Sequence, residues 1–165
     1  MKIVKALAVL VAVSALAGCD KDKTTDADAQ EYAQGKILEL IKKQAPKNKE
    51  ACDTGRELIV FLKNTKQDIS TAEWATDNCR ESIDPSTGVK LSNVTVFRNK
   101  DGSIKSICSH VTGKNYDKSN VTVPAIVNEG GAFIQFEYSS IKRSQPGEYR
   151  SLQEEFSMIS KTSCK

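Results

Sequence analysis

Histidine and tryptophan each occur only once in this chain of 165 residues. The single histidine, His110, stands two residues from Cys108, and no CxxC pair is present, so the usual ligand spacing of a zinc site is missing. A GxSxG nucleophile elbow and a Gly-rich phosphate-binding loop are absent as well. We therefore expect no metal, no cofactor and a protein that is not an enzyme.

The sequence also has no cluster of basic residues. Its formal net charge is +3, and no run of Lys or Arg is longer than two residues. Domains that bind nucleic acid carry basic residues gathered on one face or stripe. Nucleic acid is therefore not an expected partner.

The apolar run Ala6–Ala17 is too short to be a membrane-spanning helix, because it would rise only about 18 Å against a hydrocarbon core of about 30 Å. It follows a basic start and is itself followed by the small residue Gly18, which is the layout of a cleavable secretory signal. The run ends in Leu16-Ala17-Gly18-Cys19, which resembles the lipobox of bacterial lipoproteins. The resemblance implies a signal peptide over residues 1–18 and acyl chains on Cys19. An ordinary secretory signal with a chance cysteine is the alternative.

The residues after Cys19 indicate where such an anchored protein would reside. Asp20 resembles the signal that keeps lipoproteins of enteric bacteria in the inner membrane, and under other sorting rules we expect the outer membrane. Residues 19–28 alternate charges without a large apolar side chain, so they are predicted to be a tether for a single domain over residues 29–165. Loss of Lys2 and Lys5 with the leader would reduce the net charge to about +1. We expect a domain that faces the periplasm.

The remaining cysteines are even in number, as is typical of an exported protein with disulfides. They are Cys52, Cys79, Cys108 and Cys164. Three pairings are possible, and the sequence does not decide among them. We prefer Cys52 with Cys79 and Cys108 with Cys164, because antiparallel helices would bring the first two together.

Helical patterns fill the first half of this domain. Asp28 and Glu31 have the spacing of a capping box, which predicts a helix over 29–45 that Pro46 ends. A second helix is predicted over 49–64 and a third over 70–80.

The second half has alternating apolar residues, which predict strands. We expect them over 91–98, 103–111, 121–127 and 132–138, with Asp101-Gly102 in a hairpin turn. Pro124 indicates a bulge or an edge position in the third strand. Tyr149, Leu152, Phe156 and Ile159 recur at helical spacing and predict a closing helix. The fold class is α+β, with N-terminal helices, a small antiparallel sheet of about four strands and a C-terminal helix.

Short motifs in the strand region give one further resemblance. Asp84-Pro85-Ser86, Asn93-Val94-Thr95-Val96-Phe97, Ile107-Cys108 and Val111-Thr112-Gly113-Lys114-Asn115 are similar to a small exported α+β domain of unknown function. The similarity spans residues 84–138 and implies a sheet but no activity.

A near-neutral domain held by disulfides, without convergent titratable groups, is more typical of a binding protein than of an enzyme. We expect a membrane-anchored periplasmic lipoprotein that binds an envelope or exported protein, as an accessory component of an envelope complex or as an inhibitor or immunity protein. One alternative is a small-ligand-binding lipoprotein, which needs a sizeable apolar pocket. The other is a weak periplasmic hydrolase, which needs two facing acids with perturbed pKa values.

Overall fold

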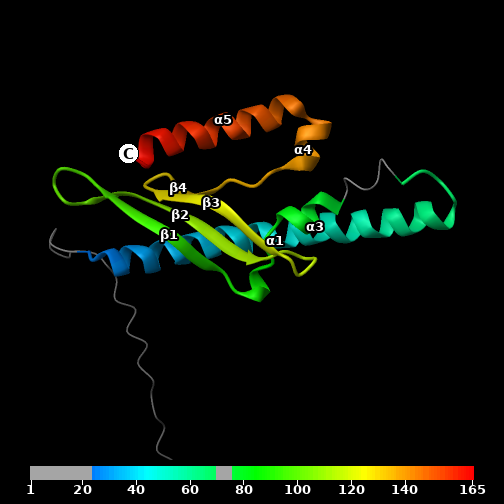
Figure 1. The fold of residues 1–165 in the computed structure, drawn as a ribbon, viewed down its shortest axis with the longest axis horizontal. Helices are drawn as coiled ribbons and strands as arrows, with labels where there is room; N and C mark the ends of the chain where they lie inside the picture. Colours follow the sequence, from blue (N-terminus) through cyan, green and yellow to red (C-terminus); the bar gives the residue numbers. More distant parts are fainter. Residues whose placement is uncertain (1–23, 70–75) are drawn as a thin grey trace, which may run out of the picture.

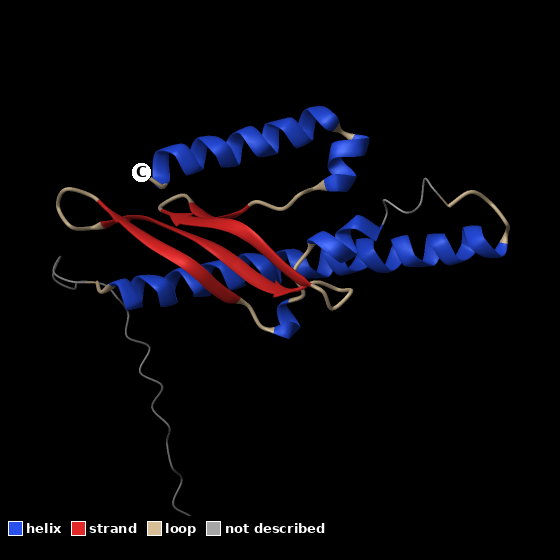
Figure 2. Ribbon diagram, viewed as in Figure 1, coloured by secondary structure: helices blue, strands red, loops and turns tan. Residues whose placement is uncertain are grey.

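The computed structural model describes residues 24–69 and 76–165 and has the predicted α+β architecture (Figures 1 and 2). One long helix is followed by an antiparallel sheet in the order β1-β2-β3-β4 and then by a C-terminal helix. The helices are α1 (Asp26–Asn64), α3 (Asp77–Glu81), the 3-10 turn η2 (Pro85–Thr87), α4 (Ser139–Ser144) and α5 (Pro146–Ser163). The strands are β1 (Lys90–Arg98), β2 (Ile104–Lys114), β3 (Asn120–Asn128) and β4 (Gly131–Ile134).

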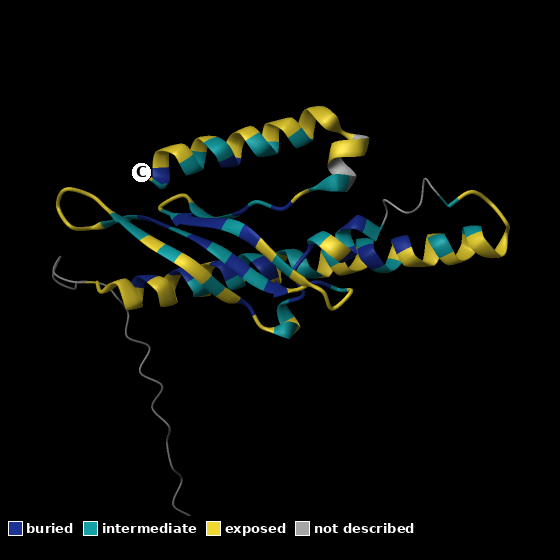
Figure 3. Cartoon of the chain, in the orientation of Figure 1, coloured by how far each residue is buried: buried dark blue, intermediate teal, exposed yellow. Residues whose placement is uncertain are grey.

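Helix α1 covers one face of the sheet, and its buried stripe builds the core. Ala29, Ala33, Ile37 and Ile41 repeat every fourth residue, so they lie on one side of the helix. They pack against the inward side chains of the sheet, and burial of an isoleucine contributes about 1.5 to 3 kcal/mol. Figure 3 shows the buried residues concentrated along this contact. The sheet partners are Ile107, Val111, Val123, Ala125, Val127 and Ile134.

Helix α5 lies over the opposite face and is fastened to it at the C-terminus (Figure 1). Cys108 of β2 forms a disulfide with Cys164, with a Cα–Cα distance of 6.0 Å. The hydroxyl of Ser106 donates to the Ser163 carbonyl, and the Asn128 amide donates to the Ser163 hydroxyl at 3.2 Å. The sheet is therefore the middle of three layers.

The prediction that Pro46 ends the first helix was wrong. A proline inside a helix loses the bond that its own N–H would donate, and its ring crowds the carbonyl four residues earlier, at a combined cost of about 3 kcal/mol. The helix continues where contacts on both sides offset that cost. Before Pro46, α1 packs on the sheet, and after it Cys52 is bonded to Cys79 of α3. The Tyr116 hydroxyl also donates to the carbonyl of Ala45 at 3.1 Å.

The start of α1 was predicted three residues too late. Thr25 is the N-cap, and its hydroxyl accepts from the Asp28 N–H while the Asp28 carboxylate accepts from the Thr25 N–H, as in a capping box. The Arg98 guanidinium then donates to the Thr24 carbonyl and the Asp26 carboxylate, which joins the helix start to the end of β1. Residues 26–28 of the predicted tether are therefore helical.

The strands lie where the alternating pattern predicted them, with differences at two ends. β2 continues to Lys114, and the fourth strand ends at Ile134 rather than at residue 138. Pro124 lies in neither a bulge nor an edge strand. It belongs to β3, an inner strand, and pairs in regular register with His110 of β2. Its missing N–H faces the end of β4, because its carbonyl accepts from Gln135 there. Residues 70–75 of the predicted third helix lie outside the described residues.

No helix in residues 24–69 and 76–165 is both long and apolar enough to cross a membrane. The leader and Cys19 lie outside this range.

The preferred cysteine pairing predicts a specific loss of stability. Cys52 and Cys79 are separated by 27 residues, so replacing both with alanine should lower the free energy of unfolding by about 3 to 4 kcal/mol. The matched double variant at Cys108 and Cys164, separated by 56 residues, should lose slightly more. Urea titration of both oxidised variants measures the difference. A loss below about 1 kcal/mol in both would contradict the idea that these bonds restrict the unfolded chain.

The lowered pKa of the Asp84 carboxyl predicts how the stability of the fold depends on pH. The Ser86 hydroxyl, 2.6 Å away, is the main cause that holds the pKa of this carboxyl below its ordinary 3.8; partial burial opposes the shift, and the Ser86 N–H and Lys118 support it. A carboxyl with a lowered folded pKa stabilises the fold above its unfolded pKa, and this contribution disappears as the pH falls through the folded value. The stability difference between the parent and Asp84→Asn should therefore be constant near neutrality and shrink below pH 3.8.

Thermal unfolding between pH 7 and pH 2 measures this difference. Ser86→Ala is the control, because it keeps the carboxylate and removes its main partner, so it should weaken the pH dependence. A stability difference between the parent and Asp84→Asn that increases as the pH falls would contradict this expectation.

Candidate functional site

The residues proposed from the sequence as sites are not brought together in one place. Cys19 and Asp20 lie outside the described residues. Cys52, Cys79, Cys108 and Cys164 are used in two disulfides on different layers. Within residues 24–69 and 76–165, no group of three His, Cys, Asp or Glu side chains is arranged to hold a metal ion.

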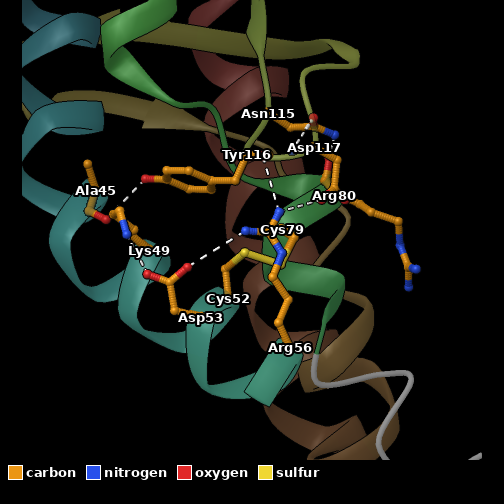
Figure 4. Close-up of a disulfide and its surroundings, with 10 residues drawn as sticks. All are labelled: Ala45, Lys49, Cys52, Asp53, Arg56, Cys79, Arg80, Asn115, Tyr116 and Asp117. Atoms are coloured by element: carbon orange, nitrogen blue, oxygen red, sulfur yellow. Dashed lines mark hydrogen bonds and ion pairs between the residues drawn. A yellow bond between two sulfur atoms is a disulfide. The ribbon is translucent and has the colours of Figure 1, made fainter. Parts of the chain in front are cut away.

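The polar loop after β2 holds the fold together through its side-chain contacts (Figure 4). The Asn115 side chain donates to the Arg80 carbonyl at 2.8 Å and accepts from the N–H groups of Asp117 and Ser119. Arg56 of α1 forms an ion pair of 2.7 Å with Asp117. Together with the Cys52–Cys79 bond, these contacts fasten the middle of α1 to the sheet.

One catalytic pattern was missed in the sequence: Ser139 and Lys142 have the SxxK spacing of some serine acyl transferases. Both side chains line a hollow of about 480 Å³ beside β3. The Lys142 ammonium lies 5.5 Å from the centre of the Tyr149 ring, and no described hydrogen bond joins it to the Ser139 hydroxyl. A serine nucleophile needs a base within hydrogen-bond reach, so nothing in this arrangement supports catalysis.

The most site-like feature is a groove between the two long helices, beside β4. Its inner part is a hollow of about 170 Å³, with Leu40 of α1 on one side and Leu152, Phe156 and Ile159 of α5 on the other. A larger hollow of about 640 Å³ continues from it toward α3. Leu40, Gln44 and Tyr138 line both, so the two form one continuous depression, which we name the α1–α5 groove.

The floor of the groove is the outer edge of β4, the last strand of the sheet. Phe133 pairs with Ile126, and the Gln135 N–H donates to the Pro124 carbonyl at 3.0 Å. Because bonded and non-bonded pairs alternate in an antiparallel ladder, Ala132 and Ile134 direct their backbone N–H and carbonyl groups away from β3. Among these four groups, only the Ile134 carbonyl has a described partner, the Tyr138 hydroxyl at 3.5 Å.

The two rims of the groove carry opposite charges. Lys43 and Lys47 lie on the α1 side, whereas Glu148 and Glu155 lie on the α5 side. None of the four forms an ion pair with another residue in the described part of the chain. The rims can therefore pair with charges on a bound molecule.

Tyr138 stands where the two hollows meet. Its backbone has a φ of 51°, which is the left-handed region that non-glycine residues seldom adopt. Burial is the main cause that raises the pKa of its hydroxyl, and the negative charge of Glu155 adds to it. The hydroxyl therefore stays protonated and remains a hydrogen-bond donor inside the groove.

Sequence patterns identified the helix stripes of the groove but not the groove itself. Leu152, Phe156 and Ile159 were on the predicted stripe of the closing helix, and Leu40 and Gln44 stand four residues apart in the helix predicted over 29–45. Nothing in the spacing showed that the two stripes would flank the same strand edge. The end of β4 at Ile134 was equally hidden, because the apolar alternation continues to Tyr138.

Comparisons with known protein families, with curated proteins and with solved structures gave no match to this chain. The similarity of residues 84–138 to an exported domain therefore stays a prediction.

Proposed function

We propose that this protein is a bacterial lipoprotein, anchored through acyl chains on Cys19 and facing the periplasm, whose domain binds another protein in the α1–α5 groove. The groove carries the proposal, because it combines apolar side chains with backbone groups and charges that have no partner among the described residues. Apolar anchors inside a polar rim are typical of protein-binding surfaces. The partner would be a component of an envelope complex or an exported protein that the domain inhibits.

The two disulfides support an exported location, since such bonds persist in oxidising compartments. Multiple acyl chains would anchor the chain stably, because each buried methylene contributes about 0.8 kcal/mol. If the enteric rule for Asp20 holds, the anchor is in the inner membrane.

The alternatives have less support. The hollow of about 640 Å³ is large enough for a small ligand, and it stays a second candidate because it is partly apolar. For the hydrolase, the carboxyl groups with a resolved shift are Asp28, Asp84 and Asp101, and each has a lowered pKa caused mainly by a neighbouring hydroxyl. A general acid needs a raised pKa, so no observation favours that alternative.

The anchor is tested by Cys19→Ser. Cells fed a radiolabelled fatty acid should label the parent chain and leave the variant unlabelled, because the serine hydroxyl does not replace the thiol as the acyl acceptor. The variant should also keep its unprocessed mass. Labelled acyl chains on Cys19→Ser would overturn the assignment.

The binding site is tested by photocrosslinking in cells. A benzoylphenylalanine placed at Gln44 or at Leu152 lines the groove, whereas the same group at Met158, which is 64% exposed on α5, lies outside both hollows. We expect a defined crosslinked protein from the two groove positions and not from Met158.

Two outcomes would contradict this expectation. The absence of crosslinks from both groove positions would overturn protein binding at this site. A product of twice the chain mass would show that a second copy of this chain occupies the groove instead of another protein.

A further inference from the structure

We propose that the occupant of the α1–α5 groove is an extended segment of the partner protein, which pairs with the outer edge of β4 as a fifth strand. This inference rests on the proposed function and adds the conformation and charge pattern of the bound segment. An added strand gains affinity from backbone hydrogen bonds and specificity from alternate side chains.

The backbone of β4 supplies the template. The N–H and carbonyl groups of Ala132 and the N–H of Ile134 have no described partner, and they face into the groove. Unpaired groups of this kind are satisfied by another strand at hydrogen-bond distance. The Tyr138 hydroxyl, 3.5 Å from the Ile134 carbonyl, is a weak partner that a backbone N–H would displace.

The helices on both sides of the edge provide the contacts for side chains. In a strand laid along β4, successive side chains point to opposite faces of the sheet. One set would therefore contact Leu40 on α1, and the other would contact Leu152 and Phe156 on α5. A segment with apolar residues on both sides at its centre fits this slot.

The rims add a charge pattern to the segment. Side chains that point to the α1 face reach Lys43 and Lys47, and those that point to the α5 face reach Glu148 and Glu155. The groove therefore favours acidic residues on one side of the bound strand and basic residues on the other. In sequence, this is an alternation of acidic and basic residues next to the apolar centre.

The opposite edge of the sheet is a poorer template. The pairing of β1 with β2 shifts between Ser92 and Thr95, and Asn93 has a φ of 52°, so the free edge is interrupted by a bulge. Lys90 and Arg98 stand at its two ends. Charges and bulges are the usual means by which edge strands avoid pairing.

The probe is a peptide obtained by phage display. A library of random linear dodecapeptides is selected for binding to the lipoprotein purified in detergent. The best-enriched peptide is synthesised unmodified and in two forms, N-methylated at odd or at even residues. Because only alternate residues of an added strand bond to β4, one methylated form should lose at least tenfold in affinity and the other should bind within twofold of the parent.

The protein variant is Ala132→Pro, which removes an outward N–H without breaking a bond to β3. It should weaken the unmodified peptide about five- to tenfold, as expected for one lost hydrogen bond. Met158→Ala is the control, because Met158 is 64% exposed and lies outside both hollows, and it should bind within twofold. Unfolding midpoints show that both variants are folded.

Three results would overturn strand addition. They are equal losses of affinity for the two methylated peptides, unchanged peptide affinity of folded Ala132→Pro, and a selection that enriches no peptide. If any of these results occurs while the groove positions still crosslink to a protein in cells, the proposed protein binding stands and only the proposal of an added strand is overturned. Missing crosslinks would instead overturn the proposed function.

Discussion

The packing of α1 on one face of the sheet is the contact on which the rest of the structure depends. Its stripe of Ala29, Ala33, Ile37 and Ile41 is fully or almost fully buried, and it meets the inward side chains of β2 and β3. Ala29 and Ala33, the small residues at the start of the stripe, are fully buried in the core. Once this face is covered, α5 is left to cover the other, and the edge of β4 lies between the two helices as the floor of the groove.

The disulfides fix the parts that this core does not reach. Cys52 lies beyond the portion of α1 that contacts the sheet, and its bond to Cys79 holds α3 against the helix, together with the Arg56–Asp117 ion pair. Cys108–Cys164 performs the same role for the end of α5. That ion pair joins two half-exposed side chains, so it contributes at most about 1 kcal/mol, and the covalent bonds dominate.

Periodicity predicted the fold class and most elements, because burial on one side of a helix or strand imposes a repeat that a sequence displays. It failed where a distant contact decided the outcome. Pro46 is an ordinary helix terminator, yet the contacts at Ala45 and Cys52 keep α1 continuous. At the start of α1, Thr25 with Asp28 and Asp28 with Glu31 have the same local spacing, and the structure uses the first pair as the cap, with Arg98 bonded to Asp26 beside it.

The groove was beyond prediction for a related reason: it is a property of two elements that are far apart in the sequence. Leu40 and Leu152 are apolar residues of two predicted helices, and neither position signalled a groove. Both line the depression beside β4, because β4 is the last strand of the described sheet and no described strand pairs with its outer edge. The charges of Lys43 and Glu155 carried no signal in the sequence, since both stand among other charged residues on exposed helix faces.

The short β4 edge limits unwanted pairing with other sheets. A long unpaired edge would add a second sheet as readily as a single strand, and natural proteins avoid this by shortening or covering it. Here the edge strand has only four residues, which are half-buried or buried, and residues of α1 and α5 flank it. A strand that already belongs to another sheet would bring its neighbours against these helices, whereas one extended segment fits between them. The same geometry that limits pairing with other sheets would therefore favour a single extended segment as the occupant of the groove.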